Sequence, residues 1–160
     1  MPTEYEVIGF EEVEAKLKQV ADDLGGGLMV GAMKDASLIV MRDARKLSPV
    51  DTGRLRASIA PDVRREGKSV MGVVGSNVEY APFQELGTGS MAGRGRHWPP
   101  AEALETWARR HGFASGFVVA RAIGLRGGLK AKRFLQRAVE QNKDKIVKLI
   151  DNAVKKIVDK

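Results

Sequence analysis

Few residues of this chain are of the types that perform chemistry. His97 and His111 are its only histidines, and it has no cysteine. Neither histidine has a second histidine or a carboxylate at the spacing of metal ligands, and without cysteine neither a disulfide nor a thiolate zinc site can form. We therefore expect no metal site. We expect His111 to end a helix and His97 to be exposed or at an interface.

Other catalytic patterns are also incomplete. The glycine-rich stretch that begins at Gly87 has neither the spacing of a dinucleotide fingerprint nor the Gly-Lys-Ser/Thr ending of a nucleotide-binding loop. Paired carboxylates such as Asp22 and Asp23 fall on polar faces of predicted helices, where charges are normally solvated. No serine lies in a nucleophile elbow. The sequence thus predicts no enzyme, no cofactor and no small-molecule substrate.

Positive charge is concentrated in one segment. Residues 91–137 carry 10 basic and 2 acidic residues, net +8, whereas residues 1–90 carry 11 basic and 14 acidic residues, net −3. A basic segment of this kind is typical of a surface for an acidic partner, such as nucleic acid, a membrane or an acidic protein face. It is equally compatible with a solvated or subunit-facing surface.

Length and composition predict a single domain over residues 1–160. At 43% hydrophobic and 29% charged residues, the chain can bury a core and solvate its surface. The acidic N-terminus lacks the basic start and apolar run of a signal peptide. Because charges interrupt the apolar stretches, we expect no membrane span.

Hydrophobic periodicity predicts the elements of the first half. We expect a short strand over 5–10, a helix from Val13 to Leu24 and a long amphipathic helix over about 28–47, which Pro49 ends. Residues 58–76 predict a β-hairpin that turns at 66–68, with Pro61 on an edge strand. A short extended piece is expected over 78–80.

The second half is predicted to be mainly helical. Residues 87–97 form a mobile glycine-rich loop, followed by a helical insertion at 98–128. This insertion holds a helical pair over about 99–126, whose second helix Ser115 caps. A last helix runs over about 132–158. The predicted fold class is α+β: a small antiparallel sheet packs against the long N-terminal-half helix and the long C-terminal helix.

Three ordered segments carry the most information. The first runs from Ser48 through Ile59 and reads as a helix stop, a turn capped by Asp51 or Thr52, and the start of a strand. In this segment Gly53 is expected to let the backbone pass closely, and Leu55 and Ile59 are expected to point into the core.

The second segment, 78–89, contains one helical turn that Pro82 starts and Gly87 ends. The third, 130–138, leads into the C-terminal helix.

Together these segments resemble the tail-completion, or head–tail joining, proteins of lambda-like tailed bacteriophages, the gene-product-ten-like family. In the third segment Arg133 stands where the family pattern has proline. The residues that carry the resemblance are Pro49, Val50, Asp51, Thr52, Gly53, Leu55, Ser58, Tyr80, Ala81, Glu85, Gly87, Thr88, Phe134, Leu135 and Ala138.

The resemblance implies a structural virion protein of the neck or tail end of a tailed phage or prophage. Such proteins form rings, commonly sixfold, between the head connector or adaptor and the tail tube or terminator proteins. The implied location is the virion, after assembly in the bacterial cytoplasm. A ring requires head-to-tail contacts between identical subunits.

The residues expected to meet a neighbour are mostly basic, with Arg94 and Arg96 as the principal anchors. The whole candidate interface comprises Arg94, Arg96, His97, Trp98, Arg121, Arg126, Lys130 and Lys132. An alternative reading is a nucleic-acid-binding module, in which the helical pair acts as a helix-turn-helix and Arg109, Arg110, Arg121 and Arg126 contact phosphates. Transient proximity to DNA is compatible with both readings, since DNA passes through the neck.

Overall fold

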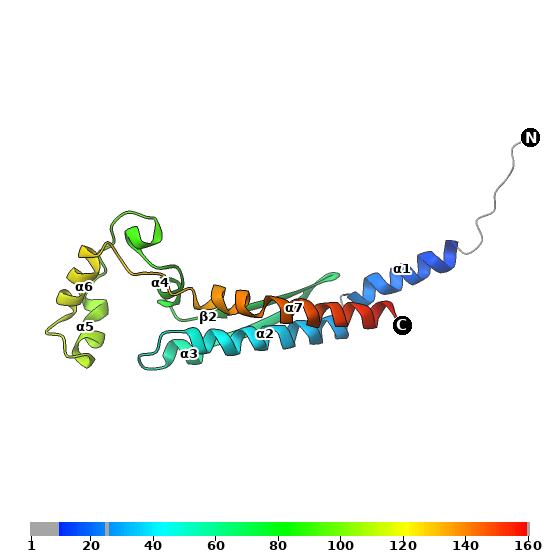
Figure 1. Cartoon of the computed structure of the whole chain (residues 1–160), viewed down its shortest axis with the longest axis horizontal. Helices are drawn as coiled ribbons and strands as arrows, with labels where there is room; N and C mark the ends of the chain where they lie inside the picture. The colour runs from blue at the N-terminus through cyan, green and yellow to red at the C-terminus, as the bar shows by residue number, and fades with distance from the viewer. Residues whose placement is uncertain (1–9, 25, 160) are drawn as a thin grey trace, which may run out of the picture. The chain divides into compact units, whose positions relative to one another are not determined.

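The computed structural model describes residues 10–24 and 26–159. It contains two long helices, a β-hairpin and several short helices (Figure 1). In chain order the elements are α1 (Phe10–Leu24), α2 (Gly27–Leu47), α3 (Arg54–Ser58), β1 (Ile59–Glu66), β2 (Ser69–Ser76), α4 (Ala81–Leu86), the 3-10 helix η1 (Gly89–Ala92), α5 (Ala101–Arg110), α6 (Gly116–Leu125) and α7 (Phe134–Val158).

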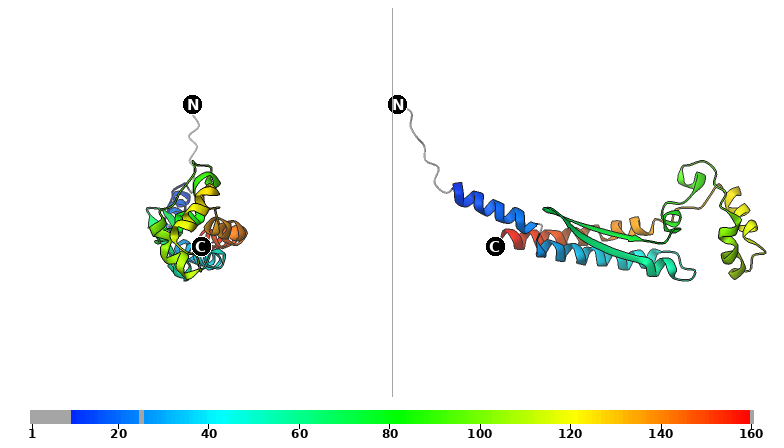
Figure 2. Two further views of the ribbon diagram at one scale, coloured as in Figure 1. Left: turned by 90° about the vertical axis from the view of Figure 1, so that its left-hand side faces the viewer. Right: turned by 180° about the vertical axis from the view of Figure 1, so that it is seen from behind.

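The predicted α+β class is confirmed. The hairpin β1–β2 packs against the long helices of both halves of the chain, and α2 and α7 run side by side (Figures 1 and 2). Gly67 turns the hairpin with a φ of 61°, a value that suits glycine because it has no Cβ. In a two-stranded sheet each strand is an edge strand, so Pro61 of β1 is tolerated.

The chain divides into two compact units that interleave along the sequence. Unit one comprises Met1–Arg42, Ala60–Val74 and Gln141–Lys160. Its close packing is clearest at Gly72 of β2, where an added Cβ would lie 2.7 Å from Ser37 Oγ and 2.8 Å from Met33 Cγ. Its buried apolar side chains come from α2 and α7 and are Met29, Ala36, Val40, Ala153 and Ile157.

Unit two comprises Asp43–Ile59 and Gly75–Glu140. Small side chains let its helices approach closely, as where α6 begins at Gly116 against the carbonyl of Ala101 in α5. Its buried apolar residues include the predicted Leu55 and Ile59. The others are Ala44, Val78, Ala81, Ala108, Ala120, Phe134 and Ala138.

Several local predictions are corrected by the structure. The strand begins at Ile59 as expected, but residues 54–58 before it form the unpredicted short helix α3, and 78–80 lead through a turn into α4. Ser115 does precede α6, but its hydroxyl makes no capping hydrogen bond. The strand expected over 5–10 falls on residues outside the described part except for Phe10, which begins α1.

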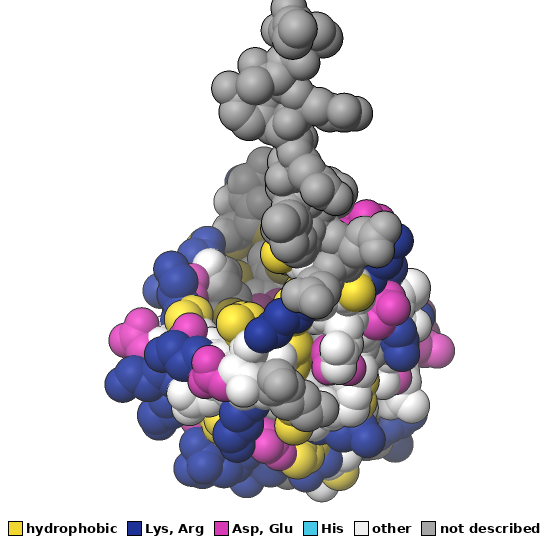
Figure 3. Space-filling view, turned by 90° about the vertical axis from the view of Figure 1, so that its right-hand side faces the viewer, with side chains coloured by type: hydrophobic (Ala, Val, Ile, Leu, Met, Phe, Trp, Pro, Cys, Tyr) yellow, Lys and Arg dark blue, Asp and Glu magenta, His cyan; other side chains and the backbone are white. Residues whose placement is uncertain are grey.

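One stretch, Val13–Leu47, is long and apolar enough to cross a membrane by length and composition alone, contrary to the expectation from the sequence. Lys34 and Asp35 are exposed within it, whereas Met29 and Val40 belong to the core. Core helices outside membranes pass the same test. On the face drawn in Figure 3, acidic, basic and hydrophobic side chains are interspersed.

Candidate functional site

The loop after α2 is held by backbone geometry. Ser48 is buried, and its Oγ donates a hydrogen bond to the Arg45 carbonyl at 2.8 Å. Gly53 adopts a φ of 82°, which an L side chain rarely takes. An added Cβ at Gly53 would face open space. The expected reason for this glycine, close passage of the backbone, is therefore wrong, and its positive φ is the reason.

The end of the first motif is anchored to both strands of the hairpin. Arg45 of α2 donates from Nε and Nη2 to the Ile59 carbonyl, at 3.1 and 2.8 Å. Ser58 Oγ donates to the Leu55 carbonyl at 2.8 Å and lies 2.7 Å from Ser76 Oγ at the end of β2. The motif serine thus joins α3 to the second strand, a role that its sequence position did not reveal.

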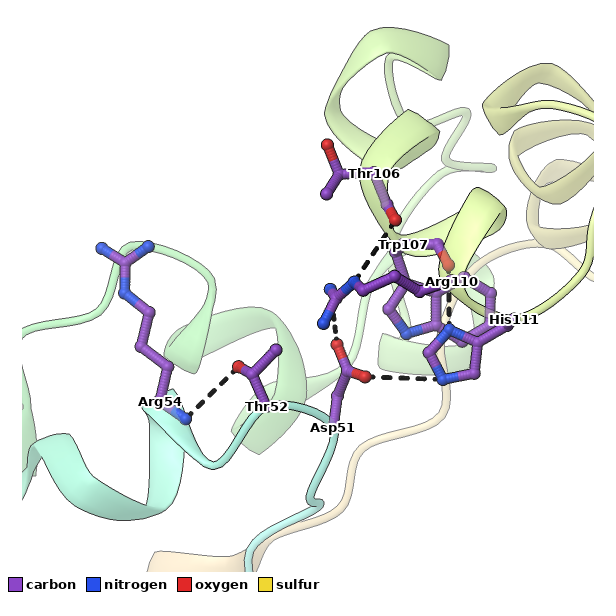
Figure 4. Close-up of polar contacts among 7 residues, drawn as sticks. All are labelled: Asp51, Thr52, Arg54, Thr106, Trp107, Arg110 and His111. Carbon is purple, nitrogen blue, oxygen red and sulfur yellow. Dashed lines mark hydrogen bonds and ion pairs between the residues drawn. The ribbon is translucent and has the colours of Figure 1, made fainter.

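Asp51 does not cap the turn but reaches α5. Its carboxylate lies 2.8 Å from Arg110 Nη2 and 3.5 Å from His111 Nε2 (Figure 4). Thr52 Oγ1 accepts from the Arg54 amide at 3.5 Å, which is long for a cap. Asp51 thus links the first motif to the C-terminal end of α5.

His111 is placed by its own helix. Its Nδ1 lies 2.8 Å from the Trp107 carbonyl, and its ring stacks on Trp107 with centroids 4.0 Å apart (Figure 4). The backbone of His111 forms the C-terminal cap of α5, which confirms the helix-end prediction. The His111 side chain also contacts Asp51. The position of His111 in the sequence gave no sign of this contact.

The second and third motifs bind each other. Glu85 of α4 accepts hydrogen bonds from the amides of Leu135 at 2.9 Å and Gln136 at 3.0 Å. These amides open α7 and have no partner within that helix, so the carboxylate acts as an N-terminal cap from a distant segment. The negative charge also suits the positive end of the helix dipole.

Thr88 extends this contact with two hydrogen bonds to Leu129. Its amide donates to the Leu129 carbonyl at 2.9 Å, and its Oγ1 accepts from the Leu129 amide at 2.9 Å. Gly87 has a φ of 72°, and an added Cβ would lie 2.6 Å from the Leu129 oxygen and 2.8 Å from the Ala131 nitrogen. We call the contact of residues 84–90 with residues 127–136 the motif joint.

The backbone conformation at Arg133 explains why this position departs from the proline of the family pattern. Its φ is 51°, and among the residues that the structure describes it is the one non-glycine residue with positive φ. Proline is fixed near −65° and lacks the amide hydrogen, whereas the Arg133 amide donates to the Glu85 carbonyl at 3.1 Å. In this backbone, proline does not fit at position 133.

The glycine-rich stretch 87–97 is part of the same joint. Ser90 donates from its amide and from its Oγ to the Gly127 carbonyl, at 2.8 and 3.2 Å. Gly89 packs so closely on the Gly127 carbonyl that a Cβ would collide with it. The stretch therefore has a defined path that includes η1, and its mobility stays a prediction.

The candidate interface residues lie mostly at the surface. Trp98 is half exposed, and part of its ring covers Gly124 of α6, where a Cβ would overlap it. His97 is half-buried beside Gly89. The six basic residues among them are all exposed: Arg94, Arg96, Arg121, Arg126, Lys130 and Lys132.

The helix pair is fastened by Glu105. Its Oε2 accepts from the Gly116 amide at 2.6 Å, and its Oε1 lies 3.0 Å from Arg109 Nε. The hydrogen bond from Gly116, followed by that from Arg109, lowers the pKa of the Glu105 carboxyl below its ordinary value. Two of the four arginines assigned to phosphates in the nucleic-acid reading, Arg109 and Arg110, are thus already paired with carboxylates.

No catalytic arrangement emerges from these contacts. Within 10–24 and 26–159, no group of three or more His, Asp or Glu side chains could hold a metal ion. The motif residues use their polar atoms on the backbone or on other side chains of the chain, as Asp51 does on Arg110. These contacts fix the course of the backbone, and they leave the basic and aromatic side chains around it at the surface.

Comparison with known proteins finds a family match within the first half of the chain. Residues 11–87 match the HK97-gp10-like family, whose description reads "Bacteriophage HK97-gp10, putative tail-component". No curated protein and no solved structure matches the chain. The matched segment contains the first motif and the second through Gly87. Residues 11–87 are thus similar to the HK97-gp10-like family of phage tail components, and this match confirms the resemblance read from the motifs.

Proposed function

We propose that this chain is a structural subunit of the virion that completes the tail end and joins it to the head connector. The observation that carries the proposal is the family match over residues 11–87. In this proposal copies of the chain assemble into a ring, sixfold as the resemblance implies, between the connector or adaptor and the tail tube or terminator proteins. Assembly takes place in the bacterial cytoplasm.

The internal role of the motif residues supports a structural function. Glu85 caps α7, Thr88 pairs with Leu129, and Asp51 holds the end of α5. Side chains used in this way are committed to the fold of the subunit. The surface left for neighbours is then formed by other residues, including the exposed Arg94 and Arg96 of the glycine-rich stretch.

Removal of the gene from the phage genome that encodes it tests this function. We expect separate filled heads and tails in electron micrographs, and complete particles again when the chain is supplied in trans. Mass spectrometry of purified wild-type particles should detect the chain. Complete, infectious particles formed in the absence of the chain would exclude the proposed role.

The arginine anchors are tested in the same complementation. Arg94→Ala with Arg96→Ala should lower the yield of complete particles at least about tenfold, because arginine is often an energetic centre of an interface. Arg64→Ala with Arg65→Ala, two exposed arginines of β1, is the matched control. If both doubles complement equally well, Arg94 and Arg96 are not anchors.

A further inference from the structure

The segment 126–133, which links α6 to α7 (Figure 1), is strongly basic. It carries four basic residues and no acidic residue, and we call these four side chains the basic strip. All four are exposed, and none of them forms an ion pair or a hydrogen bond with the residues that the structure describes. The basic strip consists of Arg126, Lys130, Lys132 and Arg133.

Other arginines of the chain use their charge on groups of the same chain. Arg45 donates to a backbone carbonyl, Arg109 pairs with Glu105, and Arg110 pairs with Asp51. The basic strip has no such partner nearby in sequence, because the two acidic residues of segment 86–139 are both in α5. Its positive charge is therefore available to a ligand.

The backbone that carries the basic strip is fixed by the motif joint. Leu129 forms two hydrogen bonds with Thr88, and the Lys132 amide donates to a carbonyl of α4 at 2.8 Å. Leu129 and Ala131 are half-buried, whereas Lys130 and Lys132 are exposed. This alternation is that of an extended chain. At about 3.3 Å per residue, the backbone positions of the two lysines are about 6.6 Å apart.

We infer that the basic strip binds the phosphate backbone of nucleic acid without reading its sequence. A chain of phosphates is the ligand whose charge complements a row of unpaired basic groups. Along each strand of duplex DNA the phosphates follow one another at about 3.4 Å, so two steps correspond to the spacing of Lys130 and Lys132. The inference goes beyond the proposed assembly role and does not depend on it.

The composition of the segment favours nucleic acid over an acidic protein. Protein interfaces have an apolar centre with few charges, but segment 126–133 has no exposed large hydrophobic side chain. Interfaces with nucleic acid are much more positively charged. This contact also differs from a helix-turn-helix, because an extended segment makes it and the paired Arg109 and Arg110 are not needed.

Binding of the purified chain to a short fluorescent DNA duplex tests the inference. Contacts with four phosphates predict an affinity that falls about a hundredfold between 50 and 200 mM salt. Lys130→Ala with Lys132→Ala should weaken binding at least about tenfold at 50 mM salt and roughly halve the dependence of affinity on salt. Because these side chains make no contacts in the described structure, circular dichroism should be unchanged.

Two lysines of α7 provide the matched control. Lys143 and Lys145 are exposed, have the same spacing in sequence and likewise form no ion pair with the described residues. Lys143→Ala with Lys145→Ala therefore changes the net charge equally and should bind the duplex like the wild type. An equal loss of affinity in both double variants, or no binding by the wild type at 50 mM salt, would overturn the inference.

Polyglutamate, added at the same concentration of charges, separates nucleic acid from an acidic protein partner. It should displace the duplex at least about tenfold less effectively than unlabelled duplex does, because it lacks the condensed counterions whose release drives binding to DNA. Polyglutamate that competes as well as DNA would overturn the inference in favour of an acidic protein face. A strong preference for one duplex sequence would contradict binding through the phosphate backbone alone.

The result is separable from the test of the proposed function. If the gene deletion leaves separate heads and tails but the purified chain does not bind DNA, the proposed function stands and this inference falls. If the chain binds DNA through the basic strip but infectious particles form without the chain, the inference stands and the proposed function falls. Arg94 and Arg96, the proposed anchors, are unchanged in these variants, so the two contacts are measured apart.

Discussion

The motif joint and the helix pair α5–α6 are stabilised by different means. In the motif joint, glycines with positive φ and backbone amides make most of the contacts, as at Gly87 and at Leu129. In the helix pair, one side of each helix packs on small residues, and α6 leaves Phe117 and Leu125 in solvent. We therefore expect the joint to tolerate few substitutions, whereas Phe117 and Leu125 on the outer side of α6 are exposed.

We expect this difference to separate residues that stabilise the fold of the chain from residues that are available for contacts with other molecules. The family match ends at residue 87, inside the joint, while the helix pair lies beyond it. We therefore expect substitutions in the joint to act mainly on the free energy of unfolding. Substitutions on the exposed side of the pair should act mainly on association.

The largest effect is expected at Gly87. Gly87→Ala combines a strained φ with a Cβ that would press on the Leu129 and Ala131 backbone, so it should lower the free energy of unfolding by about 3 kcal/mol or more. Gly93→Ala is the matched control: its φ is 70° but an added Cβ faces open space, and it should cost only about 1 kcal/mol. Urea unfolding measures both, and equal losses would mean that close packing does not distinguish the joint.

Substitutions at Arg133 are expected to lower or to raise the free energy of unfolding, depending on whether the new residue can adopt a positive φ. Arg133→Pro should lower the free energy of unfolding by about 3 kcal/mol, because proline cannot take a φ of 51° and removes the amide that donates to Glu85. Arg133→Gly should raise it by about 1 kcal/mol by relieving the strain. Arg133→Ala keeps the strain and is the control for the side chain. A proline variant as stable as the wild type would contradict the positive φ.

Regular elements were predictable from the sequence because their periodicity is long. The hydrophobic spacing predicted α2 and α7, and glycine at position 67 fitted the hairpin turn. The short helix α3 was missed because five residues hold too little periodicity to separate a helical turn from the start of a strand.

The contacts of the motif residues could not be predicted. Glu85 and Leu135 are 50 residues apart in sequence, and no local pattern tells a capping carboxylate which distant helix it serves. The same holds for Asp51, whose type and position in a turn favoured a local cap. The motifs pointed to both residues, but only the fold shows that Asp51 contacts the end of α5 and that Glu85 caps the start of α7.

Glu85 is the place in the motif joint where a side chain, and not a glycine, connects the second motif to the third. Glu85→Ala should cost about 1–2 kcal/mol of stability, the usual range for loss of an N-terminal cap. Glu79→Ala, at an exposed position just before α4, should change stability by less than about 0.5 kcal/mol. Thermal and urea unfolding give the difference. Equal effects of the two variants would show that capping by Glu85 does not stabilise the motif joint.

The smallest effect is expected in the helix pair, at Glu105. Because hydrogen bonds from Gly116 and Arg109 lower the pKa of Glu105 in the folded state, its ionised form stabilises the pair above the ordinary carboxyl pKa. This contribution is lost as the pH falls through the lowered value. Glu105→Gln should therefore be less stable than the wild type at about pH 7, and the difference should disappear as the pH falls through the lowered pKa, because the wild-type carboxyl then becomes neutral like the glutamine amide. Fluorescence of Trp98 and Trp107 during urea unfolding reports the difference, with Glu102→Gln of the same helix as control. A deficit that persists unchanged in acid would show that charge at Glu105 does not fasten the pair.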